Sequence, residues 1–341
     1  MTLSGEVVAM ALPPGFENPG LPAFTPDKSL LVVPCQDTDN ALLVNCKELA
    51  MCNSVRLPKG ACPWQAKVTP CGRWVLITNS QFAGAVELSP LDRSTICVVR
   101  MSDFTLADTV PVGAGPNGIT VSPDGATVYV ANMRSDSVSV LEVGTWRTLS
   151  EIQVGTAPAF VKLTRDGGLV VVTNFAESSV SFIDPVSHSE IHREVVGIPF
   201  APEPCPEWGP GDTVGVAIAE DRRAFITNWR SGEVVVLNIG TKSIINRFKV
   251  CDHPFGVEID HFARVVTITS GMTRRFVAFD LDSYEPLMDI PVDAETLPHG
   301  RAARLHHWIA DPQHNRILAL LAQGVNGMRA SMNLNMVSKL M

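Results

Sequence analysis

The chain has 341 residues, of which 45% are hydrophobic and 18% charged, and its formal net charge at pH 7 is −8. A chain of this length and composition buries enough apolar surface to fold without disulfide or metal support. The negative charge disfavours non-specific nucleic-acid binding, which depends on clustered lysine and arginine side chains.

The N-terminal segment contains a candidate strand rather than a targeting signal. Residues 5–12, GEVVAMAL, resemble in pattern the strand SEIQV at residues 150–154. No basic region precedes this short apolar run, so a signal peptide is not predicted. No run of about 18 apolar residues occurs anywhere in the chain, so no membrane span is predicted. We therefore expect a cytoplasmic protein.

Eight cysteines are spread along the chain without Cys-x-x-Cys spacing. In a cytoplasmic protein such cysteines normally stay reduced. We predict buried free thiols, with a Cys46–Cys52 or a Cys62–Cys71 disulfide as the alternative.

One sequence unit recurs along the chain. Residues 119–143, ITVSPDGATVYVANMRSDSVSVLEV, are matched by residues 161–185, 216–240 and 257–281, and weaker copies lie at both ends. Within each copy, polar and apolar residues alternate with a period of two around Asp-Gly-type turns, which is typical of strands. The repeat length of 42 to 54 residues is that of a four-stranded propeller blade.

The repeats predict an all-β fold, a seven-bladed β-propeller that forms a single domain over residues 1–341. The last copy lacks one strand, and residues 5–12 supply a matching one, so the N-terminal strand is expected to complete the last blade and close the ring. The predicted blades cover about residues 13–60, 61–113, 114–155, 156–197, 198–251, 252–292, and 293–341 together with 5–12.

The stretch PNGITVSPDGATVYVANMRSDSVSVLEV resembles the YVTN repeat family, bacterial seven-bladed propellers related to surface-layer and lactonase-like proteins. The resemblance covers residues 115–250 well and the rest of the chain loosely. Because members of this family include binding proteins as well as enzymes, the resemblance implies a fold more strongly than a reaction.

The segments that lead into the innermost strands form the rim where propellers usually bind ligands. Six of the seven segments contain proline, which fixes φ at a position where no sheet hydrogen bond is lost. We expect one residue just beyond each proline position to face the central funnel. The predicted ring consists of Leu21, Trp64, Asn117, Ala159, Val214, Phe255 and His299.

His299 is the first candidate for catalysis, because an imidazole exchanges protons near neutral pH. Arg301 and Arg304 follow it in the sequence and are expected to hold an anionic group. His253 and Glu258 belong to the preceding blade and are candidates for a second proton-transfer group. The alternative is that these side chains are structural, with His299 hydrogen-bonded to a loop carbonyl.

The turns after the second strand of each blade contribute further candidates at the same mouth. A repeated asparagine in these turns is predicted to be structural. The arginines and aromatic residues beside it suit an aromatic or carboxylated small molecule, although they are equally compatible with exposed turns. The predicted substrate-binding residues are Trp64, Asn117, Arg134, Phe175, Glu207, Trp208, Trp229, Arg230, Phe255 and Arg274.

Two insertions, at residues 82–95 and 198–212, lengthen loops on this rim, and the second is proline-rich enough to form a roof over the funnel. Several other signals are weak. GAGPNG at residues 113–118 leads into a strand and not into a helix, which argues against a dinucleotide site. The adjacent His306 and His307 point to opposite faces of a strand and cannot both bind one metal ion. We therefore predict neither a metal nor a cofactor, with a single-metal site built from different blades as the alternative.

Together these features predict a small-molecule enzyme that runs non-redox, acid–base chemistry. The reaction is either lactone or ester hydrolysis, as the lactonase-like resemblance implies, or a lyase or cyclisation step. The alternative is a non-catalytic propeller that binds a protein partner through the same rim. Single-stranded nucleic-acid binding by base stacking is disfavoured by the acidic charge. The sequence makes no prediction of the oligomeric state.

Overall fold

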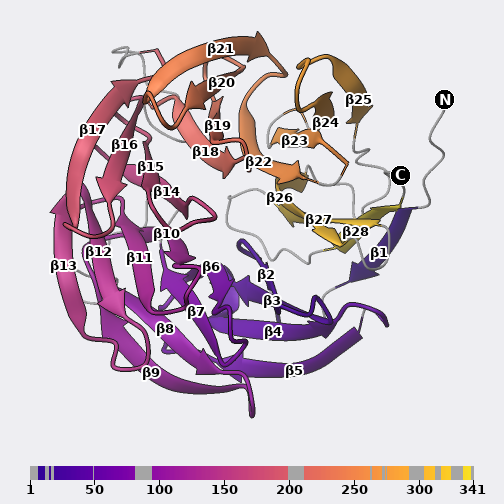
Figure 1. The fold of residues 1–341 in the computed structure, drawn as a ribbon. Coiled ribbons are helices and arrows are strands. Elements are labelled where there is room, and N and C mark those ends of the chain that lie inside the picture. Colours follow the sequence, from indigo (N-terminus) through magenta and orange to yellow (C-terminus); the bar gives the residue numbers. More distant parts are fainter. Residues whose placement is uncertain are drawn as a thin grey trace.

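The strands form a ring of sheets around a central axis (Figure 1). The computed structural model describes residues 7–11, 15–16, 19–48, 50–80, 94–198, 211–261, 263–270, 273, 275–291, 303–311, 316–323 and 333–338. In these residues the strands build seven four-stranded antiparallel sheets, and the one helical element is a short 3-10 turn, η1 (Gln36–Thr38). This confirms the predicted all-β propeller.

Six sheets, named blades one to six, each contain four strands that are consecutive in the chain. Blade one comprises β2 (Ala23–Phe24), β3 (Leu30–Cys35), β4 (Asn40–Asn45) and β5 (Ala50–Arg56). Blade two comprises β6 (Pro63–Val68), β7 (Trp74–Asn79), β8 (Thr95–Arg100) and β9 (Thr105–Pro111). Blade three comprises β10 (Pro116–Val121), β11 (Thr127–Asn132), β12 (Ser137–Glu142) and β13 (Thr148–Gln153).

Blade four comprises β14 (Pro158–Leu163), β15 (Val170–Asn174), β16 (Ser179–Asp184) and β17 (Ser189–Val195). Blade five comprises β18 (Thr213–Ile218), β19 (Arg223–Asn228), β20 (Glu233–Asn238) and β21 (Ser243–Lys249). Blade six comprises β22 (Pro254–Asp260), β23 (Val265–Ser270), β24 (Arg275–Asp280) and β25 (Pro286–Pro291). Within each blade the first strand lies innermost and contacts the first strand of the next blade.

The remaining sheet joins the two ends of the chain. It contains β26 (Ala303–Asp311), β27 (Arg316–Gln323), β28 (Asn333–Ser338) and, at its outer edge, β1 (Val7–Ala11). Strand β1 pairs antiparallel with β28, with Val7 opposite Val337 and Ala11 opposite Asn333. This pairing confirms the prediction that the N-terminal strand adds to the last sheet. Strand β26 lies beside β22 and β23 of blade six.

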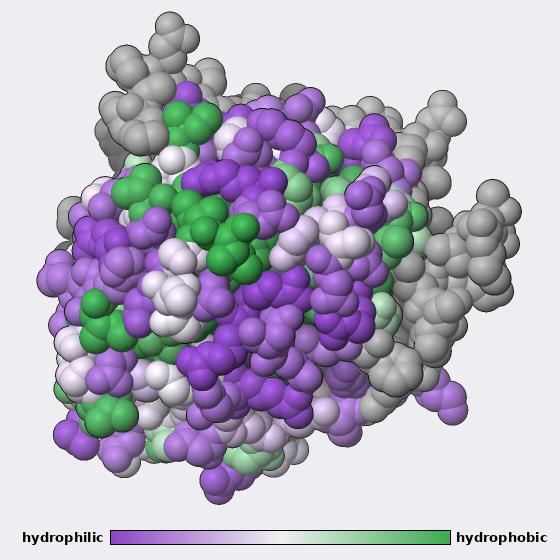
Figure 2. Space-filling model, turned by 45° about the horizontal axis from the view of Figure 1, so that its top comes forward, coloured by the Kyte–Doolittle hydropathy of each residue, from purple (hydrophilic) through white to green (hydrophobic). Residues whose placement is uncertain are grey.

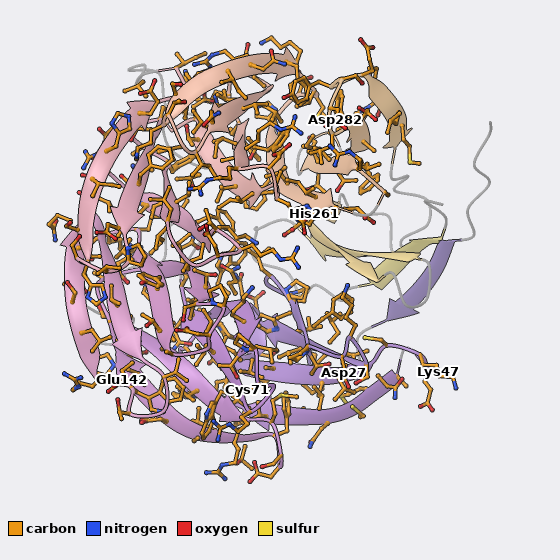
Figure 3. The ribbon with its side chains drawn as sticks, in the orientation of Figure 1. Asp27, Lys47, Cys71, Glu142, His261 and Asp282 are labelled. Atoms are coloured by element: carbon orange, nitrogen blue, oxygen red, sulfur yellow. The ribbon has the colours of Figure 1, made fainter. Side chains whose placement is uncertain are left out.

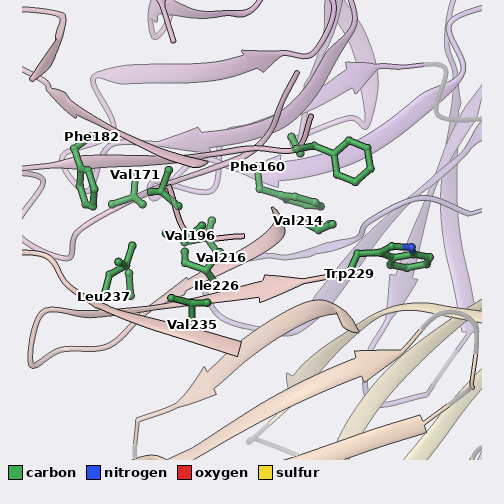
Figure 4. Packing of buried hydrophobic residues seen from close by; sticks show 14 of the residues in the cluster. Phe160, Val171, Phe182, Val196, Val214, Val216, Ile226, Trp229, Val235 and Leu237 are labelled. Atoms are coloured by element: carbon green, nitrogen blue, oxygen red, sulfur yellow. The ribbon is translucent and has the colours of Figure 1, made fainter. Parts of the chain in front are cut away.

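The hydrophobic core consists of layers between neighbouring blades, because successive strand residues point to opposite faces of a sheet. In β11, Val128 and Val130 face blade two, whereas Tyr129 and Ala131 face blade four. Figure 4 shows the layer between blades four and five, which extends from Phe182 and Leu237 to Trp229 near the axis. The period-two pattern of the repeat therefore encodes both interfaces of every blade.

Exposure rises from the innermost to the outermost strand. Every residue of β10 is buried, whereas half-buried and exposed residues alternate along β17 and β21. Within β17, Ile191 and Val195 are exposed. Figure 2 shows a largely hydrophilic surface on which hydrophobic groups form separate patches. The inner strands are thus the part of the sheet that positions any central site.

Candidate functional site at the mouth of the propeller

The entrance to the inner strands has the same backbone geometry in four blades. The residue before the proline is Cys62, Gly115, Ala157 or His253, and its φ lies between +46° and +66°. This left-handed conformation is uncommon for a residue with a side chain and is further disfavoured before proline. Because four blades share it, the conformation of His253 belongs to the repeat and does not by itself indicate a special site.

A β-bulge follows each of these prolines. In blade three, Pro116 lies opposite Asn132 and Ile119 opposite Val130, so β10 has one more residue than its partner strand. The inner strands β6, β14, β18 and β22 have the same irregularity. A bulge of this kind turns a side chain out of the regular alternation. It lies at the ring positions predicted from the sequence.

At each junction between blades one to six, the main-chain carbonyl of the ring residue in the later blade accepts a hydrogen bond from the earlier blade. Threonine supplies the donor at three of these junctions, asparagine at one and a main-chain amide at one. The donor and acceptor pairs are Leu21 N and Trp64 O (2.6 Å), Thr78 Oγ1 and Asn117 O (2.9 Å), Asn117 Nδ2 and Ala159 O (2.8 Å), Thr173 Oγ1 and Val214 O (2.6 Å), and Thr227 Oγ1 and Phe255 O (2.7 Å). Neighbouring blades are thereby joined next to the axis.

The predicted ring comes together in the folded chain. Leu21, Trp64, Ala159, Val214 and Phe255 belong to one buried cluster, although they come from five different blades. Asn117, the polar member of the described ring, is completely buried, and its Oδ1 has no hydrogen-bond partner among the described residues.

Aromatic rings pack against one another across the axis. The Phe160 ring of blade four meets the Phe255 ring of blade six edge-on, with the centroids 6.0 Å apart. Trp229 of blade five lies 6.0 Å from Phe255 in the same kind of contact (Figure 4 shows Trp229 and Phe160). Edge-to-face pairs of this kind add stability beyond the burial of their area. Phe160 was not placed in this cluster from the sequence. Its position directly after the ring residue Ala159 could have indicated it.

His253 lies against this aromatic cluster. Its ring centroid is 5.0 Å from that of Trp229, and the contact is edge-on. The imidazole is half-buried, and its buried Nδ1 forms no hydrogen bond among the described residues. A buried polar atom without a partner is costly, so the Nδ1 of His253 marks a position that a ligand group could fill.

The turn that carries Trp229 and Arg230 is held by a buried aspartate. Asp212 is completely buried, and its Oδ1 accepts hydrogen bonds from the main-chain amides of Arg230 (2.7 Å) and Ser231 (3.0 Å). The amide of Trp229 donates to the main-chain carbonyl of Asp212 (2.6 Å). Asp212 was missed as a positioning residue, although its signal is visible. It stands one residue before Thr213, at the position that Cys62, Gly115, Ala157 and His253 hold before the proline in other blades.

The other described binding candidates differ in exposure. Phe175 is buried in the same cluster as Trp64 and Phe255, whereas Arg134 is exposed at its turn. The side chain of Arg134 packs over the main chain of Gly115, where an added Cβ would lie 2.9 Å from its Cγ. The structure therefore brings four aromatic candidates together and places Arg134 at the surface.

The repeated asparagines are structural. Asn132 Nδ2 donates to the hydroxyls of Ser137 and Ser139, and Asn174 Nδ2 donates to those of Ser179 and Ser181. All four repeated asparagines are buried. Asn132 and Asn174 thus join the second strand of their blade to the third through hydroxyl groups, in place of the turn backbone that the sequence suggested. Asn228 instead donates to the main-chain carbonyl of Val196 and accepts from the hydroxyl of Thr213.

The structure does not bring Glu258 to the mouth. Glu258 lies five residues beyond His253, which corresponds to about 15 Å along an extended strand. Its carboxylate faces the Lys162 ammonium at 3.5 Å, and both side chains are about one-third exposed. The half-buried Lys67 lies close enough to interact electrostatically with both Lys162 and Glu258. Burial, and secondly repulsion by Lys162, lower the pKa of Lys67 to about 8, while attraction by Glu258 partly offsets this.

Five predicted site residues lie outside the described part of the chain: His299, Arg301, Glu207, Trp208 and Arg274. Their predicted roles stay predictions. The proposed roof at residues 198–212 is likewise described only at residue 198 and from residue 211 onward.

The described cysteines are all free. No disulfide joins Cys46 to Cys52 or Cys62 to Cys71. The prediction of buried thiols is wrong for Cys52 and Cys71, which are exposed. Cys71 stands at a turn position that other blades fill with aspartate. Hydrogen bonds from Thr69 and then from Arg73 lower its pKa to about 7.

No group of three or more histidine, cysteine, aspartate or glutamate side chains within the described part is placed to hold a metal ion. No helix in that part is long and apolar enough to cross a membrane.

Comparison with known proteins identifies the family. The family model described as "Lactonase, 7-bladed beta-propeller" matches residues 21–191, just over half of the chain. The chain belongs to this lactonase propeller family. None of the curated proteins matches its sequence.

Two solved structures share the fold at low sequence identity. Kuenenia stuttgartiensis hydrazine synthase is 18% identical, with a TM-score of 0.71 over 89% of this chain and 92% of that one. A catalytically inactive variant of virginiamycin B lyase from Staphylococcus aureus, solved with quinupristin, is 13% identical. Its TM-score is 0.74 over 98% of this chain and 99% of that one. At such identities the likeness shows the fold alone, so function has to be argued from the site.

Proposed function

We propose that this member of the lactonase propeller family is an enzyme of non-redox chemistry that acts on a small aromatic or carboxylated molecule at the mouth of the propeller. Hydrolysis of a lactone or ester is the reaction that family membership favours. A lyase or cyclisation step uses the same groups and is the second possibility.

The observation that carries this proposal is the inward packing of the aromatic residues at the mouth. Trp64, Phe175, Trp229 and Phe255 are each at most 6% exposed. A propeller that grips a protein partner through this rim would present its aromatic side chains outward. Buried aromatic rings with a few polar groups among them are instead typical of small-molecule sites.

The polar groups beside the aromatic cluster suit acid–base chemistry. The imidazole of His253 is the described proton-transfer candidate, since its Nδ1 forms no hydrogen bond among the described residues. We assign the first proton-transfer role to His299, the ring residue of the following sequence unit. Arg301, Arg134 and Arg230 are proposed to hold the anionic part of the substrate. Glu258 is left out because it pairs with Lys162.

For the fold itself, we propose that the seven sheets form one closed seven-bladed ring of YVTN-type repeats. Six blades follow one another through their inner strands, and the sheet containing β1 and β26 adjoins blade six. In this arrangement His299 completes the ring of residues at the mouth. The family description supports the same number of blades.

The test combines ligand binding and turnover. Wild-type protein, His299→Ala and His253→Ala are screened by thermal shift and hydrolysis assays against panels of lactones, aryl esters and aromatic carboxylates. His261→Ala is the matched control, because His261 is exposed and follows β22, whereas His253 precedes that strand. Figure 3 shows the position of His261.

The proposal expects at least one compound to stabilise the wild type. It further expects turnover of that compound or a close analogue to fall by about 100-fold or more in His299→Ala, the usual size of a lost general acid or base. His261→Ala should behave like the wild type. If no compound binds, or if His299→Ala retains full turnover, the proposal fails.

A further inference from the structure

Three charged side chains lie at equivalent positions of alternate inner strands. Lys67 of β6, Lys162 of β14 and Glu258 of β22 each lie three residues after the ring residue of their blade, and each is half-buried. The corresponding residues of blades three and five are Thr120 and Ala217, which carry no charge. Blades two, four and six thus each carry an ionisable side chain at the same level of their innermost strands.

The alternation of the inner strands fixes the direction of these side chains. Ala66 and Val68, on either side of Lys67, pack in the layer between blades one and two. Val161 packs between blades three and four, and Val257 between blades five and six. Since neighbouring residues of a strand point to opposite faces, the charged side chains turn away from the preceding blade.

The charged groups meet across the axis. The Lys162 Nζ lies 3.5 Å from the Glu258 Oε1, although blade five separates their strands in the ring. Ala217 holds the equivalent position in blade five, so no long side chain stands between them at this level. A direct contact between blades four and six requires both side chains to reach into the central space.

Among the described side chains, this cluster carries one more positive than negative charge. Lys162 forms an ion pair with Glu258, and the same carboxylate also attracts the Lys67 ammonium, so two lysines share one described counter-charge. The pKa of Lys67, about 8, still leaves the ammonium predominantly charged at pH 7. Glu258 offsets only part of the desolvation of Lys67 and of its repulsion by Lys162, and an anion that binds beside Lys67 relieves both.

We propose that Lys67 and Lys162 form a binding site for a small oxyanion on the propeller axis, with Glu258 as the resident counter-ion of Lys162. Each ammonium group has three donor hydrogens, and an oxyanion of the phosphate, sulfate or carboxylate type offers several acceptor atoms to both lysines at once. The site lies deeper along the inner strands than the mouth and uses none of the residues assigned to the proposed reaction.

The experiment measures sulfate and phosphate binding by isothermal titration at pH 7 and constant ionic strength, with chloride as the replaced ion. Lys67→Met removes the charge and keeps the length of the aliphatic stem. Lys67→Arg keeps the charge. Lys47→Met is the matched control, because Lys47 is exposed at the periphery of the propeller (Figure 3).

The wild type is expected to bind the oxyanion above the chloride background. Lys67→Met should weaken binding by about tenfold or more, the usual effect of losing a hydrogen bond between charged groups. Lys67→Arg should retain binding within about threefold, and Lys47→Met should match the wild type. Absence of binding to the wild type, or unchanged binding to Lys67→Met, overturns the proposal.

A second measurement needs no variant and therefore does not depend on the folding of Lys67→Met. The wild type is methylated with formaldehyde and a borohydride reductant, with or without sulfate at equal ionic strength, and lysine modification is quantified by peptide mass spectrometry. Sulfate should slow modification of Lys67 several-fold and leave that of Lys47 unchanged. Equal rates at Lys67 with and without sulfate would contradict the site. Neither experiment involves a lactone, so its outcome is separate from that of the proposed function.

Discussion

At the junctions between blades, different chemical groups donate a hydrogen bond to the same acceptor, the buried main-chain carbonyl of the next ring residue. Between blades two and three, four and five, and five and six, a threonine hydroxyl donates to the buried carbonyl of the next ring residue. Between blades three and four the corresponding residue is Ala131, and the amide of Asn117 donates in its place. Between blades one and two it is Pro34, and the main-chain amide of Leu21 donates.

The comparison shows that the acceptor, and not the donor, is the constant feature of the junction. A buried carbonyl without a partner costs about 1–3 kcal/mol, so each junction retains a donor even where the repeat residue is replaced. Asn117 therefore has a structural role through its Nδ2, while its buried Oδ1 forms no hydrogen bond among the described residues.

The largest expected effect is at the junction that uses the main chain. Gly20→Ala would place a Cβ 1.9 Å from the carbonyl oxygen of Trp64 and force the backbone away from the hydrogen bond made by Leu21. Overpacking and the lost hydrogen bond together should lower the free energy of unfolding by about 4 kcal/mol. Urea denaturation measures this loss. Gly168→Ala is the control, since its nearest neighbour is a flexible side-chain atom of Asp166 at 3.3 Å, and it should change stability by less than about 1 kcal/mol.

The next effect concerns a threonine junction. Thr227→Val keeps the shape of the side chain but removes the donor to Phe255 O and the acceptor for the amide of Gly215 (2.8 Å). Leaving these two buried groups unpaired should cost about 2–3 kcal/mol in urea unfolding. Thr227→Ser retains the hydroxyl and should cost less than about 1 kcal/mol. Equal losses in the two variants would show that packing, and not the hydrogen bond, dominates this junction.

A rescue experiment sharpens the comparison between junctions. Asn117→Ala removes the donor to Ala159 O and should destabilise the protein by about 1–2 kcal/mol. Adding Ala131→Thr restores the threonine found at the equivalent position of other blades and should recover about 1 kcal/mol. The double-mutant cycle measures this coupling. Additive effects of the two substitutions would mean that the junctions are not equivalent.

The smallest expected effect on stability concerns a turn rather than a junction. Asp27, Asp124 and Asp166 accept hydroxyl hydrogen bonds in the turns of blades one, three and four, and Cys71 takes this position in blade two (Figure 3 labels Asp27 and Cys71). Because hydrogen bonds from Thr69 and Arg73 favour the thiolate, alkylation of Cys71 by iodoacetamide should rise with pH around a midpoint of about 7.

The alkylation midpoint has a direct control. Thr69→Val removes the hydroxyl that lies 3.5 Å from the Cys71 Sγ, so the midpoint should move to higher pH. An unchanged midpoint would assign the effect to Arg73 alone. Cys71→Asp restores the residue of the other turns and should leave the free energy of unfolding within about 1 kcal/mol of the wild type.

Much of the fold followed from local sequence. The alternation in residues 119–143 identified strands whose two faces pack against two neighbouring blades, because side-chain direction in a strand has a period of two. Proline at positions 63, 116, 158 and 254 marked the entrances of the inner strands, and the structure begins β6, β10, β14 and β22 there. The strand at residues 5–12 was predicted from the missing partner of the last unit, and β1 pairs as expected.

The candidate site was only partly predictable. The ring positions placed Trp64 and Phe255 in one cluster, since equivalent residues of a circular repeat converge on the axis. The contact between Phe160 and Phe255 and the charge cluster around Lys67 were missed. In the sequence these features are only an aromatic residue beside a small ring residue and a lysine in an apolar inner strand. Neither feature predicts a contact, because the curvature of the ring decides which residues meet.

The sequence by itself determined the strands, the blade repeat and the residues at the strand entrances, because these depend on side-chain alternation and on the restricted φ of proline. Only the tertiary structure decided which donor reaches each junction carbonyl, that Glu258 pairs with Lys162 and not with His253, and that the aromatic rings at the mouth pack inward. These contacts join residues far apart in the chain. Their distances depend on the tilt and curvature of whole sheets, which no short stretch of sequence encodes.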